Sequence, residues 1–269
     1  MINLSETDFI KLSEFIQKEF GINMTKKKEL LSSRIMQIIR EFKYDSLEAY
    51  VEYILEKPTT KDLEILLNAV TTNYTYFMRE NEHFQYFKEE VLPQLVKRKD
   101  DNTLNIWCAG CSTGQEAYTI SMILKDYFAN SSTKWDTRIL ATDISSEVLD
   151  IAKEGIYDES SIKEMSDNWV DKYFDKIGNG NYQANKELRN NISFRIFNLM
   201  DDIKFKVKFD VIFCRNVMIY FSKETKSALV RRFYDASVKE GYLFVGQSEN
   251  ISNLNVPYKY LIPSAYIKR

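Results

Sequence analysis

The stretch Leu104-Asn-Ile-Trp-Cys-Ala-Gly-Cys-Ser-Thr-Gly114 carries the signals that decide the fold of this chain. Residues 104–109 are mainly apolar and predict a short strand. Residues 110–114 contain two glycines and two hydroxyl side chains, which predict a turn. The apolar rhythm over 115–128 predicts an amphipathic helix. A strand, a glycine turn and a helix in this order are typical of the start of a βαβ unit.

The alternation of strands and helices continues towards the C-terminus. A second strand is predicted over 137–143, and Ser145 is placed to cap a helix that ends near Lys153. Further strands are predicted at 192–197, 209–214 and 242–246, a helix at 223–239, and a closing hairpin from strands around 259–262 and 265–268. This order predicts an α/β fold with a mostly parallel sheet.

The first part of the chain follows a purely helical pattern. Apolar residues recur at helical spacing from Phe9 to Phe20, and Gly21 is a helix stop. Further helices are predicted at 26–42, 45–55 and 60–69. We therefore divide the chain into an all-α N-terminal domain (1–72), a connecting segment and helix (73–102) in which Pro93 opens a new helical turn, and an α/β domain (103–269) with an inserted subdomain (155–190) that contains a small hairpin.

The scarce residue types exclude several classes of function. Lysine and arginine number 37 against 39 aspartates and glutamates, and this balance argues against a nucleic-acid or membrane-surface binder. The chain has three cysteines and one histidine, His83, whose spacing matches no zinc motif, so we expect no metal. An odd number of cysteines fits a reducing compartment. Because neither a secretory signal nor a span of ~20 apolar residues is evident, we expect a cytoplasmic protein.

The turn at 110–114 fits three motifs. Gly110-Cys-Ser-Thr-Gly114 has the form of a nucleophile elbow, but a hydrolase of that type needs a histidine after the serine, and His83 precedes it. Trp107-Cys-Ala-Gly-Cys111 resembles a thioredoxin-like redox pair, yet Cys108 falls inside the predicted strand. The third motif is a nucleotide-cofactor turn in which glycines let the backbone approach a ligand.

The cofactor interpretation points to a particular ligand class. The pyrophosphate fingerprint G-x-G-x-x-G is absent, so a cofactor with a ribose and no phosphate, such as S-adenosylmethionine, fits better. Asp143 ends the second predicted strand, where a carboxylate can accept hydrogen bonds from ribose hydroxyls. The structural alternative is a tight turn followed by an aspartate that caps the next helix.

Seven segments stand in the order typical of one family. They are Asn73-Tyr-Thr-Tyr-Phe-Met-Arg79, Ile106-Trp-Cys-Ala-Gly-Cys-Ser-Thr-Gly-Gln-Glu116, Ala141-Thr-Asp-Ile-Ser145, Gly155-Ile-Tyr157, Phe194 to Leu199, Cys214-Arg-Asn-Val-Met-Ile-Tyr-Phe221 and Gly246-Gln-Ser-Glu249. Through these segments the chain resembles the chemotaxis receptor methyltransferases, the CheR family, along nearly its whole length. The departures are mild: Met78 where phenylalanine is usual, Gln115-Glu116-Ala117 where Glu-Glu-Pro is common, and Gln247 where histidine is common.

The resemblance implies a Rossmann-like, S-adenosylmethionine-dependent protein-glutamate O-methyltransferase. Such an enzyme forms methyl esters on glutamates in the cytoplasmic helical region of membrane chemoreceptors during chemotaxis adaptation, and releases S-adenosylhomocysteine. It also implies a monomer that takes no nucleic acid and does not insert into the membrane. The cofactor contacts that it implies are Asn73, Thr75, Arg79, Glu116, Asp143, Asn198, Leu199, Arg215 and Asn216. Tyr220 and Arg79 are the implied catalytic residues.

Individual roles follow from charge. Glu116 and Arg79 suit the amino and carboxylate ends of the methionine moiety, and Asn198 suits the adenine edge. The structural alternatives are that Asn73 and Thr75 cap the following helix, that Arg79 forms a surface ion pair, and that Tyr220 and Phe221 are core aromatics.

The proposed reaction is compatible with a chain that is poor in histidine. A glutamate side chain has an ordinary pKa of ~4.3 and is already an anion at neutral pH, so methyl transfer needs no general base. Two other functions stay open from the sequence: a methyltransferase of the same fold that acts on a small molecule, and a catalytically silent module that binds the cofactor or the receptor.

Overall fold

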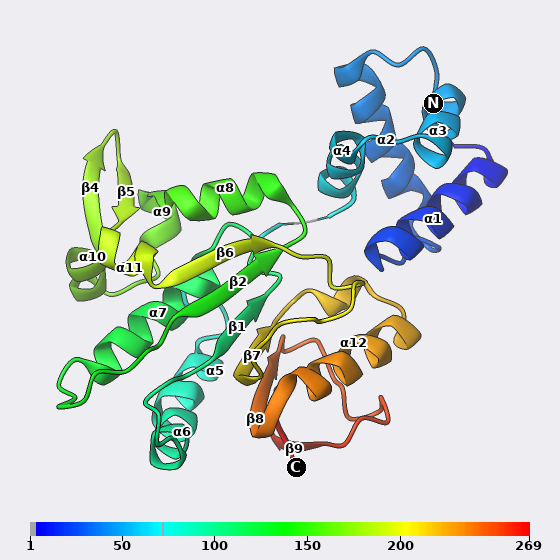
Figure 1. Ribbon diagram of the computed structural model, residues 1–269. Coiled ribbons are helices and arrows are strands. Elements are labelled where there is room, and N and C mark those ends of the chain that lie inside the picture. The colour runs from blue at the N-terminus through cyan, green and yellow to red at the C-terminus, as the bar shows by residue number, and fades with distance from the viewer. Residues whose placement is uncertain (1–3, 72) are drawn as a thin grey trace.

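A seven-stranded sheet forms the centre of the molecule in the computed structural model, which describes residues 4–71 and 73–269 (Figure 1). Its strand order is β6-β2-β1-β7-β8-β10-β9. The strands are β1 (Ile106–Ala109), β2 (Ile139–Asp143), β6 (Ile192–Ile196), β7 (Phe209–Cys214), β8 (Ser237–Val245), β9 (Tyr258–Ile262) and β10 (Ala265–Lys268). The five strands β6, β2, β1, β7 and β8 pair in parallel, each with the next in this order. Strand β10 pairs antiparallel with its two neighbours, β8 and β9. The expected mostly parallel sheet is confirmed.

The strand order reverses at β1, which pairs with β2 on one side and with β7 on the other. In open sheets of this kind the crossover connections leave in opposite directions at such a point, and a crevice opens beyond the carboxyl ends of the strands. The turn that follows β1 therefore lies at the place in the fold where ligands usually bind.

Helices cover both faces of the sheet, and alternate residues of the strands face them. On one face, Cys108 and Phe213 pack with α5 (Asn81–Tyr86), the π-helical turn η1 (Phe87–Val91), α6 (Leu92–Arg98) and α7 (Gln115–Phe128). On the other face, Trp107 and Ile212 pack against α12 (Lys223–Ala236). Helix α8 (Ser146–Glu154) lies beside β2 and β6.

The largest differences from the predicted bounds occur at the helix expected over 223–239 and the strand expected over 242–246. The helix that was expected to reach residue 239 ends at Ala236, and β8 begins at Ser237 instead of residue 242. Ser237 pairs with Phe209, and the next paired residue is Tyr242, so the residues between them form a bulge. The connecting helix is divided by the π-helical turn, and Pro93 stands in the first turn of α6, where its missing N–H breaks no helical hydrogen bond.

The N-terminal helices form a bundle with its own core. They are α1 (Glu6–Phe20), α2 (Lys28–Phe42), α3 (Leu47–Glu56) and α4 (Thr60–Val70). Leu12, Ile35 and Ile54 are fully buried at its centre. Side chains of Ser46 and Thr59 cap α3 and α4, while Gly21 ends α1 in the left-handed conformation, as expected.

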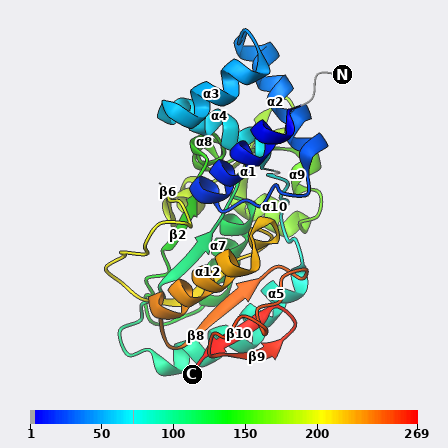
Figure 2. The same cartoon turned by 90° about the vertical axis from the view of Figure 1, so that its right-hand side faces the viewer.

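The bundle lies at one end of the sheet and is joined to it by main-chain contacts (Figure 2). Asn23 N donates to Tyr220 O at 2.8 Å, and Ile22 forms a β-bridge with Phe221. Gly21 has φ 74°, which favours glycine, and a Cβ atom there would lie 2.5 Å from Met200 Sδ, so the end of that side chain would have to move. None of the described helices is both long and apolar enough to cross a membrane.

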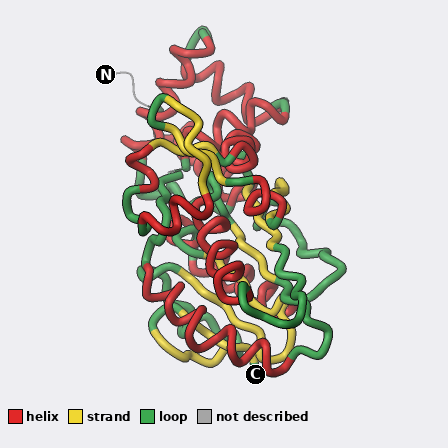
Figure 3. Tube along the Cα trace, turned by 90° about the vertical axis from the view of Figure 1, so that its left-hand side faces the viewer, coloured by secondary structure: helices red, strands yellow, loops and turns green. Residues whose placement is uncertain are grey.

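The inserted subdomain is a three-stranded antiparallel sheet that projects from the main sheet (Figures 1 and 3). Its strands are β3 (Ile156–Asp158), β4 (Phe174–Gly178) and β5 (Asn181–Ala184), and its helices are α9 (Glu159–Ile162), α10 (Asp167–Tyr173) and α11 (Lys186–Asn190). The predicted hairpin is present as β4 and β5. Strand β3 was not predicted, because its three residues are too few to show an alternating pattern.

Candidate functional site

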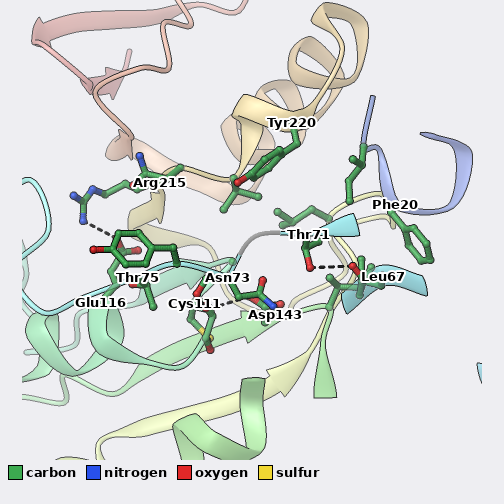
Figure 4. A pocket seen from close by; sticks show the side chains of 18 of the residues that line it. Phe20, Leu67, Thr71, Asn73, Thr75, Cys111, Glu116, Asp143, Arg215 and Tyr220 are labelled. Atoms are coloured by element: carbon green, nitrogen blue, oxygen red, sulfur yellow. Dashed lines mark hydrogen bonds and ion pairs between the residues drawn. The ribbon is translucent and has the colours of Figure 1, made fainter. Parts of the chain in front are cut away.

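A cleft that is partly open to solvent lies where the bundle meets the carboxyl ends of β1, β2 and β7 (Figure 4). Its floor is the turn after β1. Its walls come from the end of α1, the segment after α4 and the loops that follow β6 and β7. All residues that the sequence proposes for the site line this one cleft: Asn73, Thr75, Arg79, Glu116, Asp143, Asn198, Leu199, Arg215, Asn216 and Tyr220. Their individual roles remain predictions.

The turn after β1 approaches its surroundings so closely that it requires glycine at two positions. Gly110 has φ 83°, and a Cβ atom there would collide with the side chain of Val217. Gly114 has φ 96°, and a Cβ atom there would lie 2.9 Å from Ala152 Cβ. The main-chain N–H groups of Gly110 and Cys111 both donate to Thr142 O, which fixes the turn on β2.

Hydrolase and redox chemistry do not fit this turn. Ser112 Oγ donates to Asn73 O, so it anchors the neighbouring segment and contacts no histidine. Cys108 lies inside β1, as expected, and its thiol donates to Glu116 Oε1 at 3.2 Å. Burial raises the pKa values of the Cys108 and Cys111 thiols well above their ordinary range, which disfavours the reactive thiolate.

Asp143 ends β2 with its carboxylate at the cleft floor. Its Oδ2 accepts from Ser112 N at 2.8 Å and its Oδ1 accepts from Ser145 N at 3.1 Å. Ser145 is the N-cap of α8, so the alternative that Asp143 caps this helix is wrong. Burial raises the pKa of Asp143, and the partners found for it in the described chain are main-chain N–H groups. Each oxygen keeps a lone pair for a donor in the cleft.

Arg215 is a buried arginine whose donors are taken by protein groups. Its Nη1 donates to Glu116 Oε2 at 2.6 Å, and its Nη2 donates to Glu80 Oε2 at 3.1 Å and to the carbonyl oxygen of Arg79. Its guanidinium also lies 4.9 Å from the ring centre of Phe84. Two carboxylates therefore neutralise Arg215, and its side chain orients Glu116 together with the Cys108 thiol.

Glu80 connects the start of α5 to the loop after β7. Besides Arg215, its carboxylate accepts from Asn216 Nδ2 at 3.0 Å and from Gln247 N at 3.1 Å. Burial opposes ionisation of Glu80, but these hydrogen bonds and the charge of Arg215 outweigh it and lower its pKa. Sequence reasoning missed this role, because these partners of Glu80 are more than 130 residues away along the chain.

The single histidine is a neutral part of the same network. Arg215 Nε donates to His83 Nδ1 at 3.0 Å, so Nδ1 carries no proton and the imidazole proton is assigned to Nε2. Burial, helped by the charge of Arg215, lowers the pKa of His83 from 6.5 to about 4. The 3.3 Å contact between His83 Nδ1 and Glu80 is therefore not an ion pair at neutral pH.

This histidine predicts a specific pH dependence of stability. Between pH about 6.5 and about 4 the unfolded chain binds a proton at His83 while the folded chain does not, so stability is lost as the pH falls through this window. We expect a loss of about 3 kcal/mol in the free energy of unfolding. Urea denaturation of the wild type and of His83→Gln at pH 7 and pH 4.5 measures it. Equal pH dependence in both proteins would contradict the assignment.

Arg79 is the second arginine of the cleft and, unlike Arg215, is not neutralised. Its contacts with the described part of the chain are a 2.9 Å hydrogen bond to Tyr74 O and the ring of Tyr76, 5.9 Å away, and neither carries a negative charge. The alternative of a surface ion pair is therefore not what the structure contains. An arginine without a carboxylate partner at the edge of a cleft is suited to bind an anion.

Tyr220 lies in a short loop that a buried glutamate holds in place. It ends the 3-10 turn η2 (Met218–Tyr220), and Lys27 Nζ lies 5.5 Å from its ring centre. Glu249 is only 4% exposed and accepts from Asn216 N at 2.9 Å, Gly246 N at 2.6 Å and Ile219 N at 3.0 Å. Burial raises the pKa of Glu249. The sequence placed Glu249 in a motif without a role, and the structure shows that it fixes the main chain around Tyr220.

We expect Glu249→Gln to reduce kcat about tenfold or more for the methyl transfer that the family resemblance implies, because the amide end turns an acceptor of main-chain N–H groups into a donor and displaces the loop. The matched control is Asp210→Asn, which alters a carboxylate that is 1% exposed and accepts from Asn105 N at the opposite end of the sheet. Thermal unfolding and kcat are measured for both. A kcat that falls no more in Glu249→Gln than in Asp210→Asn would show that Glu249 serves stability alone.

Asn198 is partly occupied by the bundle. Its Nδ2 donates to Glu19 O at 2.8 Å, and its Oδ1 accepts from Met200 N at 2.9 Å. The side chain of Asn198 therefore joins α1 to the cleft wall. One N–H of its Nδ2 and one lone pair of its Oδ1 remain available to bind an adenine edge. Neither Asn73 nor Thr75 caps α5, whose N-cap is Glu80, so that alternative is also wrong.

The side chains that line the cleft suit S-adenosylmethionine in charge and polarity. The carboxylate of Asp143 keeps acceptors for a ribose diol, and the absence of a side chain at Gly110 lets a ligand approach the backbone. Glu116 and Arg79 have charges opposite to those of the amino and carboxylate groups of an amino acid. Ile144, Phe197 and Leu199 supply apolar surface for an adenine ring.

Comparisons with known proteins agree with this geometry. Residues 73–266 match the family described as CheR methyltransferase, SAM binding domain, and residues 7–71 match CheR methyltransferase, all-alpha domain. The chain is 36% identical to the chemotaxis protein methyltransferase of Borreliella burgdorferi, over 99% of this chain and 96% of that protein. It is 34% identical to chemotaxis protein methyltransferase 1 of Pseudomonas aeruginosa (96% and 95% covered) and 33% identical to the chemotaxis protein methyltransferase of Salmonella typhimurium (93% and 86% covered).

Proposed function

The chain belongs to the CheR methyltransferase family and is an S-adenosylmethionine-dependent methyltransferase, and from this membership we propose that it methylates glutamate side chains in the cytoplasmic helical region of membrane chemoreceptors. The observation that carries the proposal is the match of both the bundle and the sheet to relatives that are named as chemotaxis methyltransferases. The charges of the cleft support it, since Arg79 has no carboxylate partner in the described chain.

The side chains of the cleft divide the binding of the cofactor between them. We assign to Asp143 the ribose hydroxyls, to Glu116 the amino group and to Arg79 the carboxylate of the methionine moiety, with Asn73, Thr75, Asn198, Leu199, Arg215 and Asn216 completing the site. When bound, S-adenosylmethionine supplies an electrophilic methyl group on a positively charged sulfur. The protein holds that group and the glutamate in line, and such alignment contributes ~7–11 kcal/mol in well-oriented reactions.

No residue of the chain needs to remove a proton in this reaction, because the attacking glutamate has an ordinary pKa of ~4.3 and is already ionised. The neutral His83 is consistent with this, since it is buried behind Arg215 and is used as an acceptor. Tyr220 borders the cleft, where its aromatic ring can contact a cation such as a sulfonium. The loop held by Glu249 fixes the position of Tyr220.

We propose that the three parts of the chain predicted from the sequence have separate tasks in this function. Of the N-terminal domain 1–72, the described residues 4–71 cover the cleft from one side. Residues 73–102 form the connecting segment, and residues 103–269 supply the cofactor-binding sheet with the subdomain 155–190. A single copy contains all of these cleft residues, which supports action as a monomer.

The direct test is incubation of the protein with chemoreceptor-containing membranes and S-adenosylmethionine labelled in its methyl group. We expect label that stays with the receptor protein and is released by mild base, as methyl esters are. A receptor in which the candidate glutamates are replaced by alanine is the control. Label in small metabolites would support a small-molecule methyltransferase instead, and cofactor binding without any transfer would support a silent binding module.

A further inference from the structure

The cleft meets solvent along one short segment. Among the residues that line it, those that are exposed are Asn73, Tyr74 and Tyr76, and all three belong to the four residues 73–76, here called the rim segment. Tyr74 is 70% exposed and Tyr76 is 36% exposed. A residue that both lines a cleft and is largely exposed stands at its mouth, so the rim segment forms the edge that a second substrate has to pass.

The rim segment is held in place at its first two residues. Ser112 Oγ donates to Asn73 O at 3.1 Å, and Arg79 Nη1 donates to Tyr74 O at 2.9 Å. The two tyrosine rings lie side by side, with their centres 5.8 Å apart at an angle of 50°. Main-chain anchors of this kind keep the two rings together without burying them.

Tyr220, which lines another wall of the cleft, has exposed neighbours of a similar character. Ile219, which is 41% exposed, precedes Tyr220, and Lys27 lies against the Tyr220 ring. The rim segment and the surroundings of Tyr220 together offer exposed apolar side chains and a cation, Lys27. Aromatic surface flanked by positive charge is complementary to a helix that carries both apolar residues and carboxylates.

We propose that Tyr74 and Tyr76 form a docking surface for the receptor helix that presents the glutamate to be methylated. This inference rests on the proposed function. A glutamate side chain is short, so its own helix has to lie directly across the rim when the carboxylate reaches the cleft. The 5.8 Å between the two rings is close to the ~5.4 Å rise of one helical turn. The rings contact apolar side chains three or four residues from the glutamate, which lie on the same helix face.

The surface makes Tyr74 and Tyr76 specificity-determining residues for the protein substrate, separate from the residues that hold the cofactor. It selects glutamates that have an apolar neighbour one turn away over glutamates that are flanked by charged residues only. Large exposed aromatic residues often contribute most of the binding energy at such contacts.

The test compares Tyr74→Ala and the double variant Tyr74→Ala/Tyr76→Ala with the wild type on receptor membranes. We expect the KM for receptor to rise about tenfold in the double variant, while the affinity for S-adenosylmethionine, measured by calorimetry, changes less than twofold. The matched control is Tyr260→Ala, since Tyr260 is 50% exposed and its ring centre lies 5.9 Å from that of Tyr266 on the distant β9–β10 hairpin.

Three results would overturn the inference: an unchanged receptor KM in the double variant, an equal rise in Tyr260→Ala, or a loss of cofactor affinity that accounts for the lost activity. These three results differ from a failure of the proposed function. If the proposed function is wrong, the wild type itself transfers no base-labile methyl groups to receptors.

Discussion

Replacing Asp143 by alanine is expected to weaken the binding of S-adenosylmethionine by about 10- to 150-fold. Hydrogen bonds to a charged group contribute ~1.5–3 kcal/mol, and every ~1.4 kcal/mol changes the dissociation constant tenfold. Asp143 is suited to such bonds because each of its oxygens keeps a lone pair beyond those used by Ser112 N and Ser145 N. Isothermal calorimetry with S-adenosylmethionine measures the change directly, without a receptor.

The alanine variant also releases the two N–H groups that Asp143 holds, so a second variant separates binding from structure. Ser145→Ala removes the side-chain cap of α8 but leaves the Asp143 carboxylate in place. We expect it to lower the melting temperature and to leave the dissociation constant within about threefold of the wild type, since a lost cap costs ~1 kcal/mol of stability. An unchanged affinity in Asp143→Ala would remove this residue from the ribose role.

Arg79→Ala is expected to lower kcat/KM for methyl transfer by about 100-fold or more while the protein stays folded. Removing one partner of a charge pair in a site sheltered from water costs about 2–5 kcal/mol. Arg79 can be removed without exposing a buried carboxylate, because its contacts in the described chain are the Tyr74 carbonyl oxygen and the Tyr76 ring. Transfer of labelled methyl groups to receptor membranes and the melting temperature are the two measurements.

Arg79→Lys is the conservative comparison. It keeps the charge but loses the planar, two-pronged donor group, so we expect an activity between those of the wild type and of Arg79→Ala. Arg215→Ala is expected to behave differently, because it leaves Glu80 and Glu116 without their shared cation and so destabilises the fold. Full activity of Arg79→Ala on receptor membranes would rule out its catalytic assignment.

The sequence was informative wherever the physical cause is local. The helices of the bundle begin and end where Ser46, Thr59 and Gly21 offer a cap, because a capping group interacts with the nearest turn only. The strand, glycine turn and helix around residues 104–128 were predicted because apolar spacing and glycine act over a few residues. The ordered family motifs also identified the candidate residues of the cleft. Spacing alone did not distinguish a cofactor-binding turn at residues 110–114 from an ordinary tight turn.

Local pattern failed where an element depends on its neighbours in space. Strand β8 begins at Ser237 because that residue pairs with Phe209, and no spacing in the sequence records this pairing. Strand β3 is a strand because β5 lies beside it. Helical propensity likewise does not show the π-helical turn over Phe87–Val91.

The sequence by itself therefore determined the fold class, the family and the set of residues that could line the site. Only the tertiary structure decided how those residues differ, since burial and partnership are properties of the folded chain. It showed that Arg215 is neutralised by Glu80 and Glu116 whereas Arg79 is not, and that Glu249 holds the Tyr220 loop. It also left Tyr74 and Tyr76 exposed at the mouth of the cleft, next to Asn73, whose main-chain oxygen is held by Ser112 Oγ.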